Sequence, residues 1–530
     1  MCSIVEVIDD SNNVHKYNQS AKPLGEGGQG IVYRSLNPDL AIKIERQNGV
    51  ETTDKQQIED FHKKIRNIRL LQLEDDIKIS LPLTLLKDHA GYVMKLLNSA
   101  RSCEFFLETN CHLTNLTNHT FTVCNDTVGT DVTTVGPNES CKFPSSCNDV
   151  LKRYAMSGGL RLRNITLANT ASIISRLHGR SLIYADISHN NVFFIADNAF
   201  RSTVWLIDAD NLIYEKKQTM SVFTPGYAAP EVAQKVDGVR PQSDCHAFSV
   251  LAFKMLCWVH PFLGLLSKPT DDEDDWGSDG STLGAEDRCY AGINPYIDDP
   301  NDRSNAEEVI NQAFPRKIML TKLQQKLFEV TFCKGRINPG LRPSIYHHVR
   351  AHAKASDEMV CCQHCGMSLA YDFNDDVYTC KCCDRQMQYP FGIFVLKSFW
   401  YTGKKEDKTA YKWVREVDLS KDFEISVPVR VFDIFDNRNF DEDCLYISHK
   451  KDKSFITIQK NMDSEISLSY ANKSFKNGKF NDLGNGSHIV DFKDMIMRDQ
   501  IWLLSKNKDS LYKVISFLFI GGNGNAFIGD

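Results

Sequence analysis

The sequence predicts an α+β fold in which several units follow one another along 530 residues. Apolar segments flank a glycine-rich turn near the N-terminus, helical periodicity of apolar residues is strongest in the middle of the chain, and β-branched runs between turn residues recur after about residue 390. The length corresponds to about three domains of ~150 residues each. An apolar content of 42% and a charged content of 25% are ordinary for a globular protein.

Charge and targeting signals narrow the function classes. A net charge of −6 gives no general electrostatic attraction for nucleic acid. The N-terminal residues lack the basic and apolar regions of a signal peptide. The longest apolar run, Val250–Leu266, contains Lys254, His260 and Pro261, which favours a buried helix over a membrane span. We therefore expect a cytoplasmic protein that binds neither nucleic acid nor membrane.

A glycine-rich turn forms the first motif. Residues 22–44 predict a strand, the turn Gly25–Val32 and a second strand that contains Lys43. Glycines let a backbone approach phosphate groups closely, and a lysine on the next strand supplies a fixed positive charge. A plain hairpin would explain the turn alone, and a dinucleotide-binding fold would require a helix after the glycines. The second strand with its lysine favours a nucleotide phosphate site.

Two aspartates and an asparagine lie beside predicted strands later in the chain. Asp186 and Asn191 have the spacing D-x4-N and precede the apolar run Val192–Ile195, and Asp208 follows Val204–Ile207. Acidic residues at strand ends are often only turn formers. The three spacings agree with one another, which favours a functional site over simple turns.

The glycine turn, Ala41-Ile42-Lys43, Asp186–Asn191, Asp208 and Ala229-Pro230-Glu231 resemble, in this order, the motifs of a divergent, bacterial-type serine/threonine protein kinase family. The resemblance covers about residues 17–353. It implies a two-lobed protein-kinase-like domain over residues 1–353. The small lobe would span about residues 17–97, an insertion residues 101–148, and the large lobe residues 149–353.

The resemblance also implies a role for each matching residue. ATP would be bound by Gly25, Gly27, Gly30, Val32, Ala41, Lys43, Met94 and Leu96. Catalysis would depend on Lys43, Asp186, Asn191 and Asp208. Asp186 would orient the proton of the attacking hydroxyl, and Asn191 and Asp208 would hold Mg²⁺ or Mn²⁺.

Supporting residues follow from the same resemblance. On a helix expected at residues 54–73, Glu59 would pair with Lys43, and Asp60 or a shifted register is the alternative. Three further residues would stabilise the site. Thr224 would contact Asp186, Asp244 would brace the backbone of the Asp186 loop, and Arg342 would pair with Glu231. Thr224 at this position is typical of kinases that modify Ser or Thr.

Three departures from the kinase pattern bear on activity. Tyr184-Ala185 stands where the family has His-Arg, so no arginine is available there for an activation-loop phosphate. Ser188 replaces a lysine that would contact the γ-phosphate, so that contact is lost or comes from elsewhere. Asp210 replaces a glycine, where it would add a metal ligand or weaken magnesium binding.

Residues 101–148 are rich in Thr, Asn and Ser and interrupt the kinase pattern. The cysteines of this segment fit no metal template: Cys103, Cys111, Cys124, Cys141 and Cys147. We expect an exposed insertion rather than a second metal site.

A second cysteine group has metal-binding spacing. Cys362-x2-Cys365 and Cys380-x2-Cys383 predict a zinc ribbon at residues 358–390, with Cys361 and Cys382 as alternatives of register. Four protein ligands would close the zinc site, which indicates a structural role. Cysteines clustered in this way favour metal binding in a reducing compartment over disulfides.

Residues 391–530 predict an antiparallel sandwich or barrel, from runs such as 425–432, 454–458, 466–470 and 512–520. This segment faintly resembles a forkhead-associated phosphopeptide-binding domain. Because it contains no convincing phosphothreonine-binding motif, a structural or partner-docking role is favoured.

These expectations describe a kinase that uses Mg-ATP to phosphorylate Ser or Thr of protein substrates or of its own chain. A metal-dependent phosphatase is a partner that the resemblance suggests. A nucleotide-binding pseudokinase is the main alternative because of Ser188 and Asp210. A small-molecule kinase is a weaker alternative, because the segment 224–231 resembles that of protein kinases.

Overall fold

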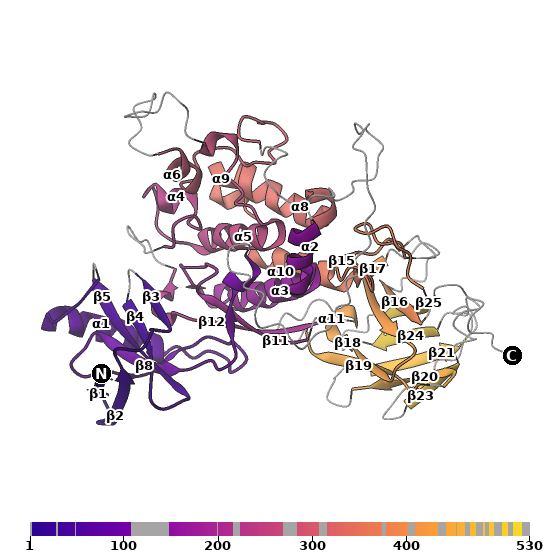
Figure 1. Ribbon diagram of the computed structural model, residues 1–530, viewed down its shortest axis with the longest axis horizontal. Coiled ribbons are helices and arrows are strands. Elements are labelled where there is room, and N and C mark those ends of the chain that lie inside the picture. The colour runs from indigo at the N-terminus through magenta and orange to yellow at the C-terminus, as the bar shows by residue number, and fades with distance from the viewer. Residues whose placement is uncertain are drawn as a thin grey trace.

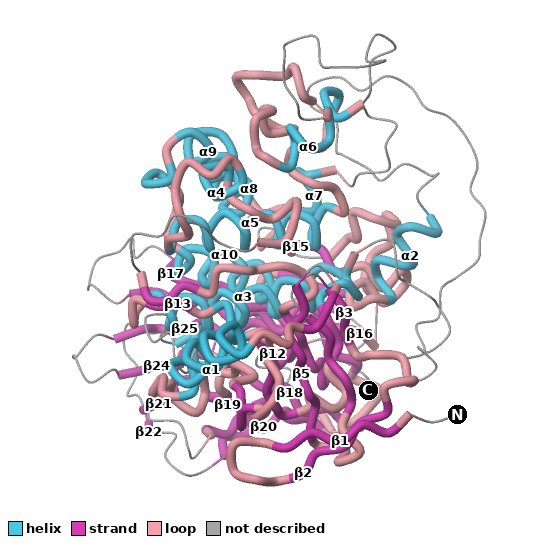
Figure 2. The backbone as a smooth tube through the Cα atoms, turned by 90° about the vertical axis from the view of Figure 1, so that its left-hand side faces the viewer, coloured by secondary structure: helices cyan, strands magenta, loops and turns pink. Residues whose placement is uncertain are grey.

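The computed structural model is an α+β protein in which β-rich parts lie at both ends of a helical centre (Figure 1). The structure describes residues 3–27, 30–47, 49–107, 148–198, 200–215, 223–268, 284–306, 315–373, 378–388, 390–400, 409–432, 441–451, 453–461, 467–472, 481–482, 487–491, 501–506 and 512–521. Seen from the N-terminal side, most helices lie above the strands (Figure 2). No helix in these ranges is both long and apolar enough to cross a membrane.

The N-terminal part is an antiparallel sheet. Its strand order is β3 (Gly25–Gly27), β4 (Gly30–Arg34), β5 (Leu40–Gln47), β8 (Gly91–Lys95) and β7 (Pro82–Leu85), and β6 (Val50–Glu51) pairs with β5. Alternate residues of β5 face opposite sides of this sheet. Ile42 and Ile44 join an outer core with the hairpin of β1 (Ile4–Ile8) and β2 (Val14–Asn18). Ala41 belongs to the main core on the other side, and the same alternation directs Lys43 to that inner side.

Helix α1 (Lys55–Arg69) covers the inner side of this sheet and is shorter than the predicted range 54–73. It begins at Asp54, whose carboxylate accepts the backbone N–H of Gln57 as an N-cap. The helix buries Phe61, Ile65 and Ile68 at helical spacing.

The central part is built on the helices α2 (Asn148–Met156), α3 (Gly159–His178), α5 (Pro241–Cys257) and α10 (Ile345–Asp357). Shorter helical segments surround them: α4 (Pro230–Ala233), η6 (Leu265–Ser267), α6 (Ala285–Tyr290), α7 (Arg316–Met319), α8 (Lys322–Glu329), η7 (Val330–Lys334), α9 (Gly335–Ile337) and η8 (Pro339–Leu341). Helix α5 covers only the first part of the apolar run Val250–Leu266. It ends where Trp258 adopts a left-handed conformation, shortly before Pro261.

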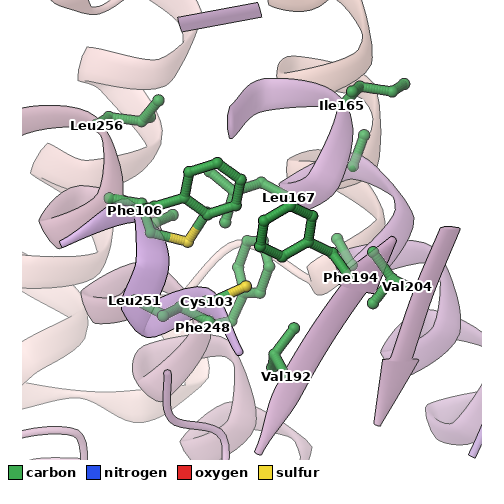
Figure 3. Packing of buried hydrophobic residues seen from close by; sticks show 14 of the residues in the cluster. Cys103, Phe106, Ile165, Leu167, Val192, Phe194, Val204, Phe248, Leu251 and Leu256 are labelled. Carbon is green, nitrogen blue, oxygen red and sulfur yellow. The ribbon is translucent and has the colours of Figure 1, made fainter. Parts of the chain in front are cut away.

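Two residues at the start of the expected insertion are buried instead of exposed. Residues 101–107 form β9 (Arg101–Ser102) and η1 (Cys103–Phe106), and the side chains of Cys103 and Phe106 are fully buried. Phe106 stacks on Phe194 with ring centroids 4.4 Å apart, in the core shown in Figure 3. The expectation of an exposed segment was therefore wrong for Cys103 and Phe106, because it followed the polar composition of the segment as a whole. Residues 108–147, with Cys111, Cys124, Cys141 and Cys147, lie outside the described ranges.

Short strands line the junction between the N-terminal sheet and the helices. β11 (Val192–Asn198) pairs with β12 (Arg201–Leu206) and with β9, and β10 (Leu182–Ile183) pairs with β13 (Ile213–Tyr214). The loops that leave these strands carry Asp186, Asn191 and Asp208.

The C-terminal part contains two antiparallel sheets. One has the order β17 (Thr409–Asp418), β16 (Phe391–Trp400), β25 (Tyr512–Gly521), β24 (Ile501–Lys506), β21 (Ser467–Asn472) and β22 (Asn481–Asp482). The other has the order β18 (Phe423–Pro428), β19 (Asp443–His449), β20 (Phe455–Lys460) and β23 (Ser487–Asp491). Trp413 of the first sheet and Ile447 of the second belong to one shared core. The run predicted as a strand over 425–432 is strand only to Pro428 and continues as α11 (Val429–Phe432).

This β-rich part packs tightly against the helices. Arg161 of α3, 1% exposed, forms ion pairs with Glu416 of β17 at 2.5 and 2.7 Å. The guanidinium of Arg415 lies 3.9 Å from the ring centroid of Phe200. Between the two parts lies a small unit with β14 (Met359–Cys361) paired to β15 (Ser368–Ala370).

Candidate functional site

The glycine turn forms a β-hairpin, as expected from its sequence. Gly25 pairs with Val32 and Gly27 with Gly30 across β3 and β4. Gly30 has a φ of 154°, and a Cβ there would lie 2.5 Å from the carbonyl oxygen of Ile44, so only glycine is accommodated. A Cβ on Gly25 or Gly27 would meet no atom of the described residues within 4 Å, which leaves a side of the hairpin that a ligand could approach.

Lys43 lies opposite Tyr92 on β8 and points toward two aspartates. Its ammonium Nζ is 2.9 Å from Asp208 Oδ1 and 3.2 and 3.1 Å from the two carboxylate oxygens of Asp210. Burial alone would lower the pKa of Lys43, but Tyr92 and the carboxylates of Asp210 and Asp208 outweigh it and raise the pKa. The buried amine therefore remains charged.

Glu59 does not pair with Lys43, which corrects the prediction. Its carboxylate is 2.8 Å from Arg66 Nη1 and is 60% exposed. Asp60, the alternative, is exposed and accepts a hydrogen bond from Gln56. The reason is rotational: the buried stripe of α1 runs through Phe61 and Ile65, so Glu59 and Asp60 lie on the solvent side.

Two of the predicted ATP-binding residues, Met94 and Leu96, lie at and just after the C-terminal end of β8. Met94 is buried opposite Ala41, and both belong to the main core. The backbone N–H of Leu96 donates to the carbonyl oxygen of Asp39 at 2.8 Å. This N–H is therefore already bonded within the protein, so the expected contact of Leu96 with ATP would not use it.

Asp186 lies at the centre of a hydrogen-bond network. Its Oδ1 accepts the hydroxyl of Thr224 at 2.8 Å and the backbone N–H of Thr224 at 2.9 Å. Its Oδ2 accepts the side-chain amide of Asn191 at 2.9 Å. Burial raises the pKa of Asp186, although the hydrogen bonds from Thr224 and Asn191 oppose this rise. The hydrogen bonds from Thr224 and Asn191 hold the Asp186 carboxylate in a single orientation.

Asn191 and Asp208 are joined through the backbone. The N–H of Ile207 donates to the carbonyl oxygen of Asn191 at 3.0 Å. Asn191 uses its amide nitrogen toward Asp186, and its amide oxygen accepts no hydrogen bond from the described residues. Asp208 has a left-handed backbone, with φ 56°, and a side chain that is 21% exposed. Amide and carboxylate oxygens are ligands that a hard cation such as Mg²⁺ prefers.

Two further contacts form as the sequence predicted. Asp244 accepts the backbone N–H groups of Tyr184 and Ala185 at 2.9 and 3.0 Å. Arg342 forms two hydrogen bonds with Glu231, at 2.6 and 2.7 Å. The first contact fixes the backbone just before Asp186.

Ser188 is fully buried, and its hydroxyl has no hydrogen-bond partner among the described residues. It therefore cannot supply the phosphate contact that a lysine would make at this position. Its neighbour His189 instead bonds Tyr227.

A buried contact near Thr224 was missed in the sequence. The Lys254 ammonium of α5 is 3.0 Å from the Tyr227 hydroxyl, and Tyr227 also contacts Nδ1 of His189 at 2.7 Å. Burial lowers the pKa of Lys254 to about 8. A lysine inside an otherwise apolar run was the signal that could have revealed this contact.

The four predicted cysteine ligands lie together. The sulfur atoms of Cys362, Cys365, Cys380 and Cys383 are all within 4.8 Å of one another. The backbone N–H groups of His364 and Cys382 point to the sulfurs of Cys362 and Cys380 at 3.4 Å. Such N–H donors stabilise thiolates, and the four thiols could hold a zinc ion. Cys361 is not in this group, and its thiol lies 3.3 Å from the carbonyl oxygen of Gly366.

Comparisons with known proteins give a partial result. No family model matches the chain. The chain is 31% identical to "Protein kinase C delta type" of Rattus norvegicus over 99 residues, which is 19% of this chain. The match covers 14% of the relative, far less than two thirds of its length. It indicates a kinase-related or zinc-finger-like region within the chain.

Proposed function

We propose that this protein is an ATP-dependent protein kinase that transfers the γ-phosphate to Ser or Thr hydroxyls of protein substrates or of its own chain. The observation that carries the proposal is the convergence of Lys43, Asp186, Asn191 and Asp208 from separate parts of the chain, with the Thr224 hydroxyl bound to Asp186 at 2.8 Å.

Phosphoryl transfer depends mainly on positioning and on neutralising the charge of the phosphates. Lys43 offers a buried charge on the inner side of the glycine hairpin, whose open face would admit the phosphates. Asn191 and Asp208 would hold Mg²⁺, which neutralises phosphate charge when it is bound. Asp186, fixed by Thr224 and Asn191, would orient the acceptor hydroxyl and receive its proton.

The proposal extends to the organisation of the chain. Residues 1–353 would form a two-lobed kinase-like domain, residues 358–390 a structural zinc ribbon, and residues 391–530 an accessory domain that braces the large lobe or docks a partner. The partners would be protein substrates and a cognate phosphatase in the cytoplasm.

The test is transfer of labelled γ-phosphate from Mg-ATP to the full chain and to generic protein acceptors. Wild type and the control Asp88→Ala, which removes an exposed carboxylate, should label Ser or Thr. Asp186→Ala should give no label while still binding Mg-ATP. Ordinary turnover in Asp186→Ala would overturn the proposed catalytic role.

One observation favours a second candidate, a nucleotide-binding pseudokinase. The burial of Ser188 removes the phosphate contact expected at its position. Magnesium-dependent ATP binding without transfer to any protein acceptor would select this second function. Phosphate found on metabolites but never on protein would instead indicate a small-molecule kinase.

A further inference from the structure

We propose that Asp210, rather than a carboxylate on α1, is the positioning residue that holds Lys43 for the nucleotide. This inference rests on the proposed kinase function and assigns a role to a residue that departs from the kinase pattern. It also replaces the expectation that Asp210 serves as a second metal ligand.

The two aspartates near Lys43 are in different environments. Both carboxylate oxygens of Asp210 lie within 3.2 Å of Lys43 Nζ, and the Tyr92 hydroxyl donates to Oδ1 at 3.4 Å. The Asp210 side chain is 7% exposed, whereas that of Asp208 is 21% exposed. Asp208 also contacts Lys43, through Oδ1 at 2.9 Å, but its side chain is the more exposed of the two. Asp208 is therefore the carboxylate that could turn to a metal ion while Asp210 keeps the lysine in place.

The buried side of helix α1 carries no carboxylate. Phe61 lies on this side and stacks on Tyr92, the residue paired with Lys43, with ring centroids 6.4 Å apart. Glu59 is two positions earlier, which turns its side chain about 200° around the helix from Phe61. The ammonium of Lys64 is the α1 charge that acts on Asp210, and it stabilises the Asp210 carboxylate instead of competing for its role. Glu45 of β5 is a further carboxylate near this group, and it is half-buried.

The position of Asp210 also determines how Lys43 could be released. Asp208 and Asp210 lie on one short turn, because η5 (Ala209–Asn211) directly follows Asp208. A movement of this turn would displace the lysine partner and the metal-binding carboxylate together. Helix α1 supplies neither partner of the Lys43–Asp210 pair and acts on it through the charge of Lys64. Regulation of this site would therefore act mainly on residues 208–212.

The experiment uses the full chain and four proteins: wild type, Asp210→Asn, Lys43→Met and the double variant. The dissociation constant for Mg-ATP is measured by calorimetry, together with kcat and KM, and thermal unfolding reports which variants are folded. We expect Asp210→Asn to lower kcat about 100-fold, because a catalytic group displaced by ~1 Å costs about that much. Since both residues act through one contact, their effects on Mg-ATP binding should be strongly non-additive. Asp210→Glu should recover part of kcat, because it restores the charge.

Glu59→Gln tests the alternative, that a carboxylate on α1 positions Lys43. It should change kcat and Mg-ATP binding less than about twofold, as expected for an exposed surface residue. Additive effects of Asp210→Asn and Lys43→Met would overturn the inference, as would a loss in Glu59→Gln as large as that in Asp210→Asn. An Asp210→Asn protein that needs more Mg²⁺ but binds ATP normally at saturating Mg²⁺ would identify a metal ligand instead.

Failure of the kinase proposal would give a different result from failure of the Asp210 proposal. A wild-type protein that binds Mg-ATP but transfers no phosphate would refute the kinase, while the binding cycle would still test the Lys43–Asp210 contact. A wild-type protein that binds no Mg-ATP would overturn both.

Discussion

Arg430 and Asp357 form a bidentate ion pair in the interior, with Nε–Oδ2 and Nη2–Oδ1 distances of 2.6 and 2.7 Å. The two side chains are 4% and 1% exposed. Arg430 belongs to α11 of the β-rich part, and Asp357 is the last residue of α10. Tyr411 of β17 also donates to Asp357, at 2.8 Å. The pair therefore joins the C-terminal sheets to the helices.

Asp357→Asn should lower the free energy of unfolding by about 3–5 kcal/mol, because it leaves a buried guanidinium without its main counter-charge. Urea denaturation measures the change. The matched control is Lys450→Met, which breaks an exposed pair with Asp422 at 3.0 Å and should cost less than about 1 kcal/mol. Equal effects in the two variants would show that burial does not strengthen the Arg430 pair.

The Thr224 hydroxyl should matter for turnover more than for nucleotide binding. Thr224→Val removes the 2.8 Å hydrogen bond to Asp186 but keeps the backbone N–H bond. We expect kcat to fall about tenfold or more, as for loss of a hydrogen bond to a charged group. Thr224→Ser keeps the hydroxyl and should retain most of the activity. Steady-state kinetics measure kcat and KM for both variants. An unchanged kcat in Thr224→Val would contradict the prediction.

The four-cysteine cluster should contain one zinc ion per chain and contribute to stability. Cys380→Ser removes a ligand from a site whose metal supplies folding free energy, so both zinc content and the unfolding temperature should fall. Elemental analysis and thermal denaturation measure these quantities. The control Cys361→Ser, outside the cluster, should keep its zinc. Loss of zinc in Cys361→Ser but not in Cys380→Ser would indicate the alternative register.

Features that depend on neighbouring residues could be predicted from the sequence. The spacing of the cysteines sufficed to predict the thiol cluster. The glycines predicted the hairpin of β3 and β4, and its pairing register agrees. In both cases the geometry is fixed within a few residues of chain, so pattern and structure are closely related.

Features that depend on the rotation of a helix or on distant pairing could not be predicted. An α-helix turns about 100° per residue, so the range expected for α1 did not determine whether Glu59 or Phe61 lies on its buried side. The Lys43–Asp210 contact joins residues 167 positions apart, and no local pattern specifies such a pair. The same holds for Arg161 and Glu416, 255 positions apart.

Asp9 should give the fold a defined acid sensitivity. Its carboxylate accepts N–H groups from Ser11 and Asn13 and lies 2.9 Å from His15 Nε2. Burial would raise the pKa of Asp9, but the hydrogen bonds from His15, Asn13 and Ser11 outweigh it and hold the pKa well below the ordinary value. A lowered folded-state pKa means that the unfolded chain takes up the proton more readily.

The stabilisation by Asp9 is therefore complete above the ordinary carboxyl pKa of about 3.9 and is lost as the pH falls below it. Asp9→Asn should be less stable than wild type at pH 6, and the difference in the free energy of unfolding should shrink as the pH falls below about 4. Urea denaturation at a series of pH values measures it, with the exposed Asp88→Asn as control. A difference that stays constant with pH would show that Asp9 acts through its shape or neutral hydrogen bonds and not through its charge.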